Sequence, residues 1–283
     1  MAVEEELYMS RKLFCELGPT AYRISVRKGI ILKNISDLFK GEKYAKTKSD
    51  KELGNIVKSH SSLILRKLQG VDMELQKNKE TNLRLAAEKI NGTVIRPGET
   101  FSLWKTIGHP KAKNGYKEGL TVSSKKGLGR GIGGGLCQMA NIIHWLVLHS
   151  PLTVTELHHH SDALFPDEKR RVPFGTGTSI FYNRLDYRFY NGTDQNMQIL
   201  VWIEDGYLCG ELRSENPINK KYKIIEENHH FRKEDEDYYR ISSIYRLITD
   251  KESGETEKEL LLSNHSKVLY DHSLIPEDQI RND

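Results

Sequence analysis

Hydrophobic positions in the first ninety residues recur every three or four residues, which predicts helices. This spacing extends over residues 50–69 and again over residues 72–90, where it stops at Asn91-Gly92, a typical turn sequence. Residues 11–32 are compatible with a short helix, a break at Gly18-Pro19 and a strand. In the second helical stretch, the residues expected to form a buried stripe are Leu83, Ala86, Ala87 and Ile90.

Beyond Asn91 the hydrophobic pattern becomes that of short strands separated by turn residues. The β-forming segments are expected at residues 93–95, 101–107 and 121–123. The apolar run from Leu136 to His149 contains no glycine or proline and therefore predicts a helix. It ends before Ser150-Pro151, because a proline disfavours helical backbone in the residue that precedes it.

Segments of alternating hydrophobicity follow this helix and predict an antiparallel sheet. They lie at residues 153–158, 178–182, 186–190, 197–203, 238–249 and 257–262. Asn191-Gly192 and residues 250–254 are expected to form hairpin turns, and the charged run at residues 226–237 is expected to be an exposed connection. The fold class is therefore α+β, with N-terminal helices followed by a central helix that packs on an antiparallel sheet.

The order of elements divides the chain into three expected regions. Residues 1–90 form a mainly helical region, residues 91–215 a central domain and residues 216–283 a C-terminal β-hairpin extension. A length of 283 residues suffices for one large domain or two modest ones.

Composition and charge indicate a soluble globular protein, with 37% hydrophobic and 29% charged residues. The formal net charge of +4 arises from interspersed basic and acidic residues, so no clustered basic face favours nucleic-acid binding. No signal peptide and no apolar stretch of transmembrane length is apparent, which predicts a cytoplasmic location. The three cysteines, Cys15, Cys137 and Cys209, are too few and too widely spaced for a disulfide framework and fit a reducing compartment.

A glycine-rich turn leads directly into Cys137, which opens the central predicted helix. The positive end of the helix dipole and the free N–H groups there favour a thiolate, the nucleophilic form of cysteine. The N–H groups of Leu136, Cys137 and Gln138 are expected to stabilise an oxyanion in acyl transfer. Substrate contacts are expected from Gly133, Gly134, Gly135, Leu136 and Gln138.

Histidines and an acidic residue follow Cys137 in the order found in papain-like and transglutaminase-like enzymes. His158 and His160 are two residues apart, so they share one face of an expected strand and either is a candidate base. Asp186 is the candidate acid that orients the imidazole. The catalytic candidates are thus Cys137, His158, His160 and Asp186, and the fold is expected to resemble a papain- or transglutaminase-like arrangement.

Two further residues are candidates for contact with a substrate. His144 lies two helical turns after Cys137 on the same helix face, where it either lines the cleft or is an ordinary core histidine. Arg188 follows Asp186 in the same predicted strand.

Other types of site remain open on the residues alone. A cysteine in an apolar helix is often a small buried hydrophobe. Cys137 with His158 and His160 would give a zinc site with an open position, although no further ligand occurs at a usual short spacing. The glycine turn lacks the Gly-Lys-Ser/Thr sequence of phosphate-binding loops, so no nucleotide or other cofactor is indicated.

Several motifs, in order over more than a hundred residues, resemble the VanW family. They are the PGETFS sequence at residues 97–102, GYKE at 115–118, GIGGGLCQ at 131–138, His160-Ser161, and LDYRF at 185–189 with Asn191-Gly192-Thr193. The chain departs from many relatives at Gly177, where an aspartate is expected in an Asp-Ala-Thr sequence.

This resemblance implies a role in glycopeptide (vancomycin-type) resistance and in peptidoglycan metabolism of the cell envelope, without defining a reaction. The residues favour a cysteine-dependent acyl-transfer or amide-hydrolysing enzyme that acts on a cell-wall peptide or its precursor. The alternatives are a non-catalytic module that binds a muropeptide or sugar, and a metal-binding protein that uses Cys137 and His158 or His160.

Overall fold

The computed structural model divides the chain into two compact units, one up to Glu42 and one from Lys43 onward. His160, a candidate base, and Ser161 lie outside the described residues. The structure describes residues 13–65, 73–123, 127–159, 162–163, 166 and 172–281.

The first unit contains a short 3-10 helix, η1 (Phe14–Glu16), and the long helix α1 (Pro19–Phe39). The strand expected after Gly18-Pro19 is therefore wrong. Proline is favoured at the first position of a helix, because its fixed φ fits a helix and its missing N–H is not needed there. The same Gly-Pro pair that suggested a break thus starts the helix.

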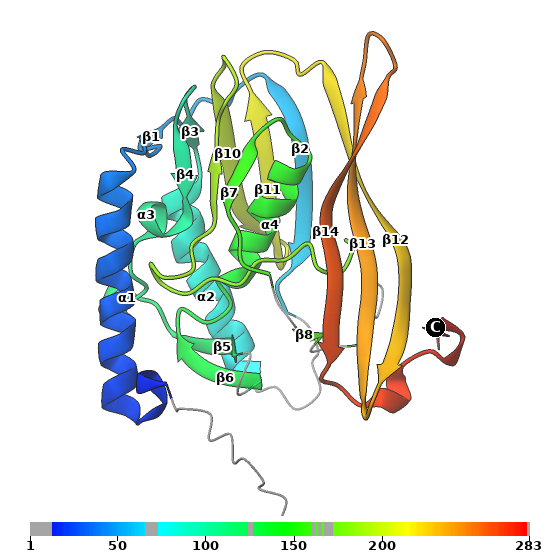
Figure 1. The fold of residues 1–283 in the computed structure, drawn as a ribbon. Coiled ribbons are helices and arrows are strands. Elements are labelled where there is room, and N and C mark those ends of the chain that lie inside the picture. The colour runs from blue at the N-terminus through cyan, green and yellow to red at the C-terminus, as the bar shows by residue number, and fades with distance from the viewer. Residues whose placement is uncertain are drawn as a thin grey trace, which may run out of the picture. The chain divides into compact units, whose positions relative to one another are not determined.

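The second unit is built on a five-stranded antiparallel sheet in the order β1-β3-β10-β11-β2 (Figure 1). Its strands are β1 (Thr47–Lys48), β3 (Thr93–Ile95), β10 (Met197–Glu204), β11 (Tyr207–Ser214) and β2 (Asn55–Leu63). Two helices pack against this sheet, α2 (Met73–Ile90) and α4 (Cys137–Leu148). Both were expected, and the predicted stripe of α2 is buried.

The helix expected at residues 50–69 is wrong, because residues 55–63 form strand β2. β2 pairs with β11, with Ser61 opposite Cys209, so its hydrogen bonds go to a partner almost 150 residues away. The spacing of the few apolar residues in this segment fits both the period of a helix and that of a strand. The region boundaries at residues 90/91 and 215/216 stay predictions, although the pairing of β2 with β11 crosses the first of them.

A second, three-stranded sheet has the order β4-β9-β7, formed by β4 (Thr100–Ser102), β9 (Arg188–Tyr190) and β7 (Thr153–Glu156). The expected extended segment at 101–107 is mostly helix α3 (Leu103–Ile107), which Ser102 caps by accepting a hydrogen bond from the N–H of Lys105. Asn191-Gly192 does not form a hairpin, because β9 and β10 belong to different sheets. Residues 178–182 form no strand and contribute only a bridge between Phe181 and Leu185.

Strand β5 (Glu118–Ser123) pairs with β6 (Gly127–Ile132), so part of the expected glycine loop is a strand. A short 3-10 helix, η2 (Ala112–Asn114), precedes this pair.

The C-terminal sheet has the order β15-β12-β13-β14-β8 and consists mainly of three long strands (Figure 1). The expected turn at residues 250–254 joins β13 and β14, whereas residues 226–234, expected to be a connection, belong to β12. The strands are β8 (Asp162–Ala163), β12 (Lys220–Glu234), β13 (Asp237–Asp250), β14 (Thr256–Val268) and β15 (Ile280–Arg281), with 3-10 helices η3 (His272–Leu274) and η4 (Glu277–Gln279). The α+β class is confirmed.

Candidate functional site

The glycine turn before α4 is shaped by close contacts within the protein. Gly133 and Gly135 have φ angles of +79° and +91°, which side chains rarely adopt. A Cβ at Gly134 would lie 2.2 Å from the carbonyl carbon of Gly119 in β5, so only glycine fits between these two backbones. These glycines therefore set the position where α4 begins, and nothing in their contacts assigns them to a substrate.

Asn82 of α2 holds this turn in place. Its side-chain amide donates to the carbonyl oxygens of Gly134 and Lys117, at 2.9 and 3.0 Å, and its Oδ1 accepts from the N–H of Lys117 at 2.8 Å. The residue is completely buried. Asn82 thus fixes the approach to Cys137 although it lies far from it in sequence.

Cys137 is the first residue of α4 and is partly buried. Burial raises the pKa of its thiol above the ordinary value, and the lowering effects of the N–H groups of Ile180 and Cys137 and of the Lys79 charge are smaller. Desolvation thus opposes the thiolate that the helix start was expected to favour. A reaction at this sulfur therefore calls for a base that removes its proton.

The N–H groups at the start of α4 are largely occupied. Those of Leu136 and Gln138 donate to carbonyl oxygens of Gly133 and Gly135, at 3.4 and 3.0 Å. The side-chain amide of Gln138 donates to the hydroxyl of Ser62 at 2.9 Å and ties α4 to β2. The third N–H expected to form an oxyanion hole, that of Cys137, acts on its own thiol and lowers its pKa.

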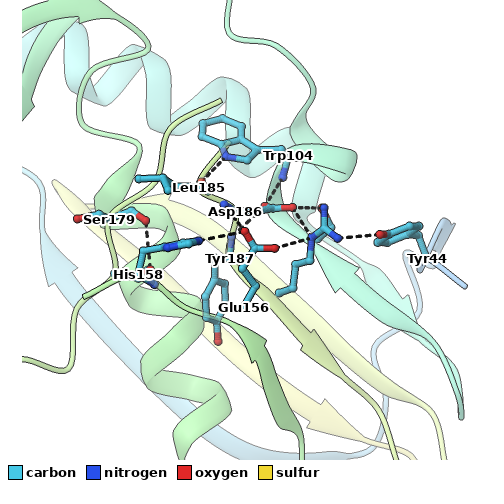
Figure 2. Close-up of polar contacts among 11 residues, drawn as sticks. Tyr44, Trp104, Glu156, His158, Ser179, Leu185, Asp186 and Tyr187 are labelled. Atoms are coloured by element: carbon cyan, nitrogen blue, oxygen red, sulfur yellow. Dashed lines mark hydrogen bonds and ion pairs between the residues drawn. The ribbon is translucent and has the colours of Figure 1, made fainter. Parts of the chain in front are cut away.

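His158 lies just beyond β7, and its imidazole has a carboxylate partner. Its Nε2 lies 3.0 Å from Oε1 of Glu156, and its side chain is 33% exposed (Figure 2). A hydrogen bond from Nε2 to this carboxylate leaves Nδ1 as the proton acceptor of the neutral ring. This arrangement suits a general base, with Glu156 in the orienting role that the sequence assigned to Asp186.

Arg188 and Asp186 hold Glu156 in position, and Figure 2 labels the two carboxylates. Nε of Arg188 lies 2.8 Å from Oδ2 of Asp186 and 3.3 Å from Oε2 of Glu156, and the N–H of Asp186 donates to Oε1 of Glu156 at 2.9 Å. Asp186 accepts further hydrogen bonds from the hydroxyl of Ser102 and the N–H of Trp104. Asp186 and Arg188 are buried, so Arg188 faces these carboxylates and not an open cleft.

Residues 177–180 connect the cysteine helix with the histidine. The N–H of Thr178 donates to Oδ1 of Asn141 in α4 at 2.8 Å, and that of Ser179 donates to the carbonyl oxygen of His158 at 2.6 Å. The next N–H, that of Ile180, lowers the pKa of the Cys137 thiol. This segment is thus bonded both to α4 and to His158.

Gly177 begins this same segment. A Cβ there would lie 3.5 Å from Oδ1 of Asn141, which is one helical turn after Cys137. The position where the family resemblance led us to expect an aspartate therefore lies beside the cysteine helix.

His144 lies on the buried side of α4, and its Nδ1 is 3.2 Å from the hydroxyl of Tyr187. Burial lowers its pKa to about 3, so the ring is neutral at physiological pH. It lines a cavity of about 390 Å³ bounded by α4, β7, β13 and β14. Among the described residues no group of three or more histidine, cysteine or acidic side chains is arranged to hold a metal, and the zinc hypothesis involves His160, which lies outside them.

Comparison with known proteins assigns the family. Residues 78–213 match the profile of the family described as "VanW like protein". Over 233 residues the chain is 33% identical to Vancomycin B-type resistance protein VanW of Enterococcus faecalis, covering 82% of this chain and 84% of the relative. The chain belongs to the VanW family.

The chain is also similar to a protein of Bacillus subtilis named Uncharacterized protein YoaR. It is 28% identical over 149 residues, which is 53% of this chain and 47% of the relative. No solved structure matches the chain. The VanW profile covers Asn82, Cys137, Glu156, His158 and the Asp186–Arg188 cluster, whereas the long strands β12 to β14 lie outside it.

Sequence reasoning missed three polar residues of this VanW site: Glu156, Asn82 and Asn141. The sequence does contain a signal for Glu156: it lies two residues before His158 in an expected strand, and residues two apart in a strand share a face. Glu156 is also the register partner of Arg188 in the β7–β9 pair, which only the sheet topology reveals. No local pattern distinguishes the two asparagines, whose roles depend on contacts between distant segments.

Proposed function

We propose that this VanW-family protein contributes to resistance to vancomycin-type antibiotics as a cysteine-dependent enzyme of peptidoglycan metabolism. The link to resistance rests on the name of its relative in E. faecalis. The proposed reaction is acyl transfer from, or hydrolysis of, an amide in a peptidoglycan peptide or its cytoplasmic precursor. The observation that carries the enzymatic part is the Glu156–His158 hydrogen bond, together with the segment that bonds both His158 and the cysteine helix.

In this mechanism Nδ1 of His158 takes the proton from the Cys137 thiol as sulfur attacks the carbonyl carbon of the amide. The carbonyl π electrons move to oxygen, and the N–H of Cys137 turns from its own sulfur to stabilise the resulting oxyanion. As the intermediate collapses, the C–N bond breaks and the imidazolium returns its proton to the leaving amine. Water or a second amine then cleaves the thioester, again with His158 as the base.

The side chains of Glu156, Asp186 and Arg188 stabilise the imidazolium of His158 and do not react themselves. Glu156 accepts the Nε2 hydrogen bond, and Arg188 prevents Glu156 from turning away. The overall arrangement proposed is papain- or transglutaminase-like, with the cysteine helix α4 packed on an antiparallel sheet. His160 stays a second candidate for the base.

The experiment is incubation of the purified protein with peptidoglycan peptides and nucleotide-linked precursors, followed by mass spectrometry of substrate and protein. We expect loss of the amide bond, and a thioester adduct on Cys137. Cys137→Ala should abolish turnover, and Glu156→Gln should reduce it about a hundredfold, a usual contribution of an oriented base. Cys209→Ala is the matched control, because Cys209 lies in β11 outside this site.

Two results would overturn the proposed reaction. One is turnover by Cys137→Ala at the rate of the unmodified protein. The other is a complete absence of turnover and adduct with every peptide in a panel that includes stem peptides, their precursors and their amidated forms.

A further inference from the structure

His144 contributes a polar side chain to a cavity whose floor is otherwise formed by apolar side chains. Its floor includes Leu148, Leu152 and Ile244, all at most 5% exposed. His144 is 2% exposed, and no described residue hydrogen-bonds its Nε2. A polar ring atom of a cavity-lining residue that has no protein partner is a place where a ligand atom or water can complete a hydrogen bond.

The partner of Nδ1 determines the character of Nε2. Tyr187 keeps its hydroxyl proton, because burial raises its pKa well above the ordinary value. Its one hydrogen-bond partner among the described residues is Nδ1 of His144. If the hydroxyl donates to Nδ1, both groups are satisfied and the proton of the neutral ring lies on Nε2. The cavity therefore receives an N–H donor from His144.

The charged groups around the cavity already have partners. The Glu156 carboxylate is bonded by His158 and Arg188, and Arg246 lies 2.7 Å from Glu259. A charged ligand would lose its hydration without gaining an unpaired counter-charge. The cavity therefore favours an uncharged ligand that has a hydrogen-bond acceptor next to apolar atoms.

We propose that this cavity binds an uncharged acylamide group, whose carbonyl oxygen accepts the hydrogen bond from Nε2 of His144. The alkyl part of the acyl group lies on Leu148, Leu152 and Ile244. Thr153 and Thr155, exposed at the mouth, bond the hydroxyl or amide groups of the rest of the ligand. The volume of about 390 Å³ is within the usual range of small-molecule pockets.

Two sources offer this chemistry, an N-acetylated amino sugar and a peptide amide. Binding does not require Cys137 to react, so it is measured with the Cys137→Ala protein, and its failure leaves the proposed reaction untouched. The probes are N-acetylglucosamine, N-acetylalanine N-methylamide, and glucose as the matched sugar without an acylamide. The signal observed is the ¹⁵N resonance of Nε2 of His144 during titration at millimolar concentrations.

We expect that N-acetylglucosamine, the capped alanine or both shift this resonance saturably, and that glucose does not. A response to one probe alone identifies the source. The paired variant His144→Phe with Tyr187→Phe removes the donor and its partner together, and should weaken binding about five- to tenfold, the usual range for one hydrogen bond. If that variant does not fold, Leu148→Trp, which fills the cavity, should abolish the response.

Three outcomes would overturn the proposal. They are no saturable shift with either acylamide, an equal shift with glucose, and unchanged affinity in a folded variant that lacks the donor or the cavity.

Discussion

Replacing Arg188 by methionine tests how strongly the buried ion pair of Arg188 with Asp186 stabilises the folded protein. Methionine keeps the length of the arginine side chain and removes the guanidinium. Arg188 is 2% exposed and Asp186 0%, so the variant leaves a buried carboxylate without its cation. Loss of one partner of a buried ion pair typically costs about 3–5 kcal/mol of unfolding free energy. Asp186 keeps the hydrogen bonds from Ser102, Trp104 and Tyr187, which favours the lower end.

The assay is urea denaturation, with Arg232→Met as the matched control. Arg232 pairs with Glu234 on the C-terminal sheet, but these side chains are 37% and 32% exposed, so the control should lose at most about 1 kcal/mol. Adding Asp186→Asn to Arg188→Met should recover part of the loss, because the unpaired charge is gone. Equal losses in Arg188→Met and Arg232→Met, or strict additivity in the double variant, would refute the reasoning.

Three further predictions concern the same framework. Gly134→Ala should destabilise the protein by more than about 2 kcal/mol in urea denaturation, because a Cβ at 2.2 Å from a backbone atom of Gly119 forces the two segments apart. Asn82→Ala should cost about 2–4 kcal/mol, since buried groups of the turn lose their partners. Burial lowers the pKa of His144 to about 3 and of His149 to about 4, so the unfolded chain binds more protons below pH 6.5. Between that pH and about pH 4, stability should fall by about 1.4 kcal/mol per pH unit for each histidine, and His149→Gln should roughly halve this slope.

Local patterns were sufficient for the two helices that frame the site. α2 and α4 have buried positions at helical spacing and end at turn residues, so their positions follow from the sequence alone. β2 was missed because its apolar spacing suits either a helix or a strand, and its pairing with distant β11 decides between them. Residues 226–234 were missed because a strand with exposed charged positions resembles a loop in composition.

The candidate site was only partly predictable for the same reason, since it depends on pairing between distant strands. The order of Cys137 and His158 in the chain suggested a cysteine–histidine pair, and the structure bonds one segment to both His158 and the cysteine helix α4. Glu156 is adjacent to His158 in space only because β7 and β9 pair in a register that places Glu156 opposite Arg188. Long-range register of this kind has no local signature.

The thiol environment defines what any reaction at Cys137 requires. The N–H groups at a helix start lower the pKa of a thiol, but here burial raises that pKa by more. In the proposed reaction, proton removal by the histidine therefore accompanies attack on the carbonyl. Iodoacetamide should accordingly alkylate Cys137 more slowly than free glutathione at pH 7, with a rate that continues to rise above pH 9. Rapid alkylation at pH 7 would mean that the sulfur is hydrated in solution, and that the helix start governs its reactivity after all.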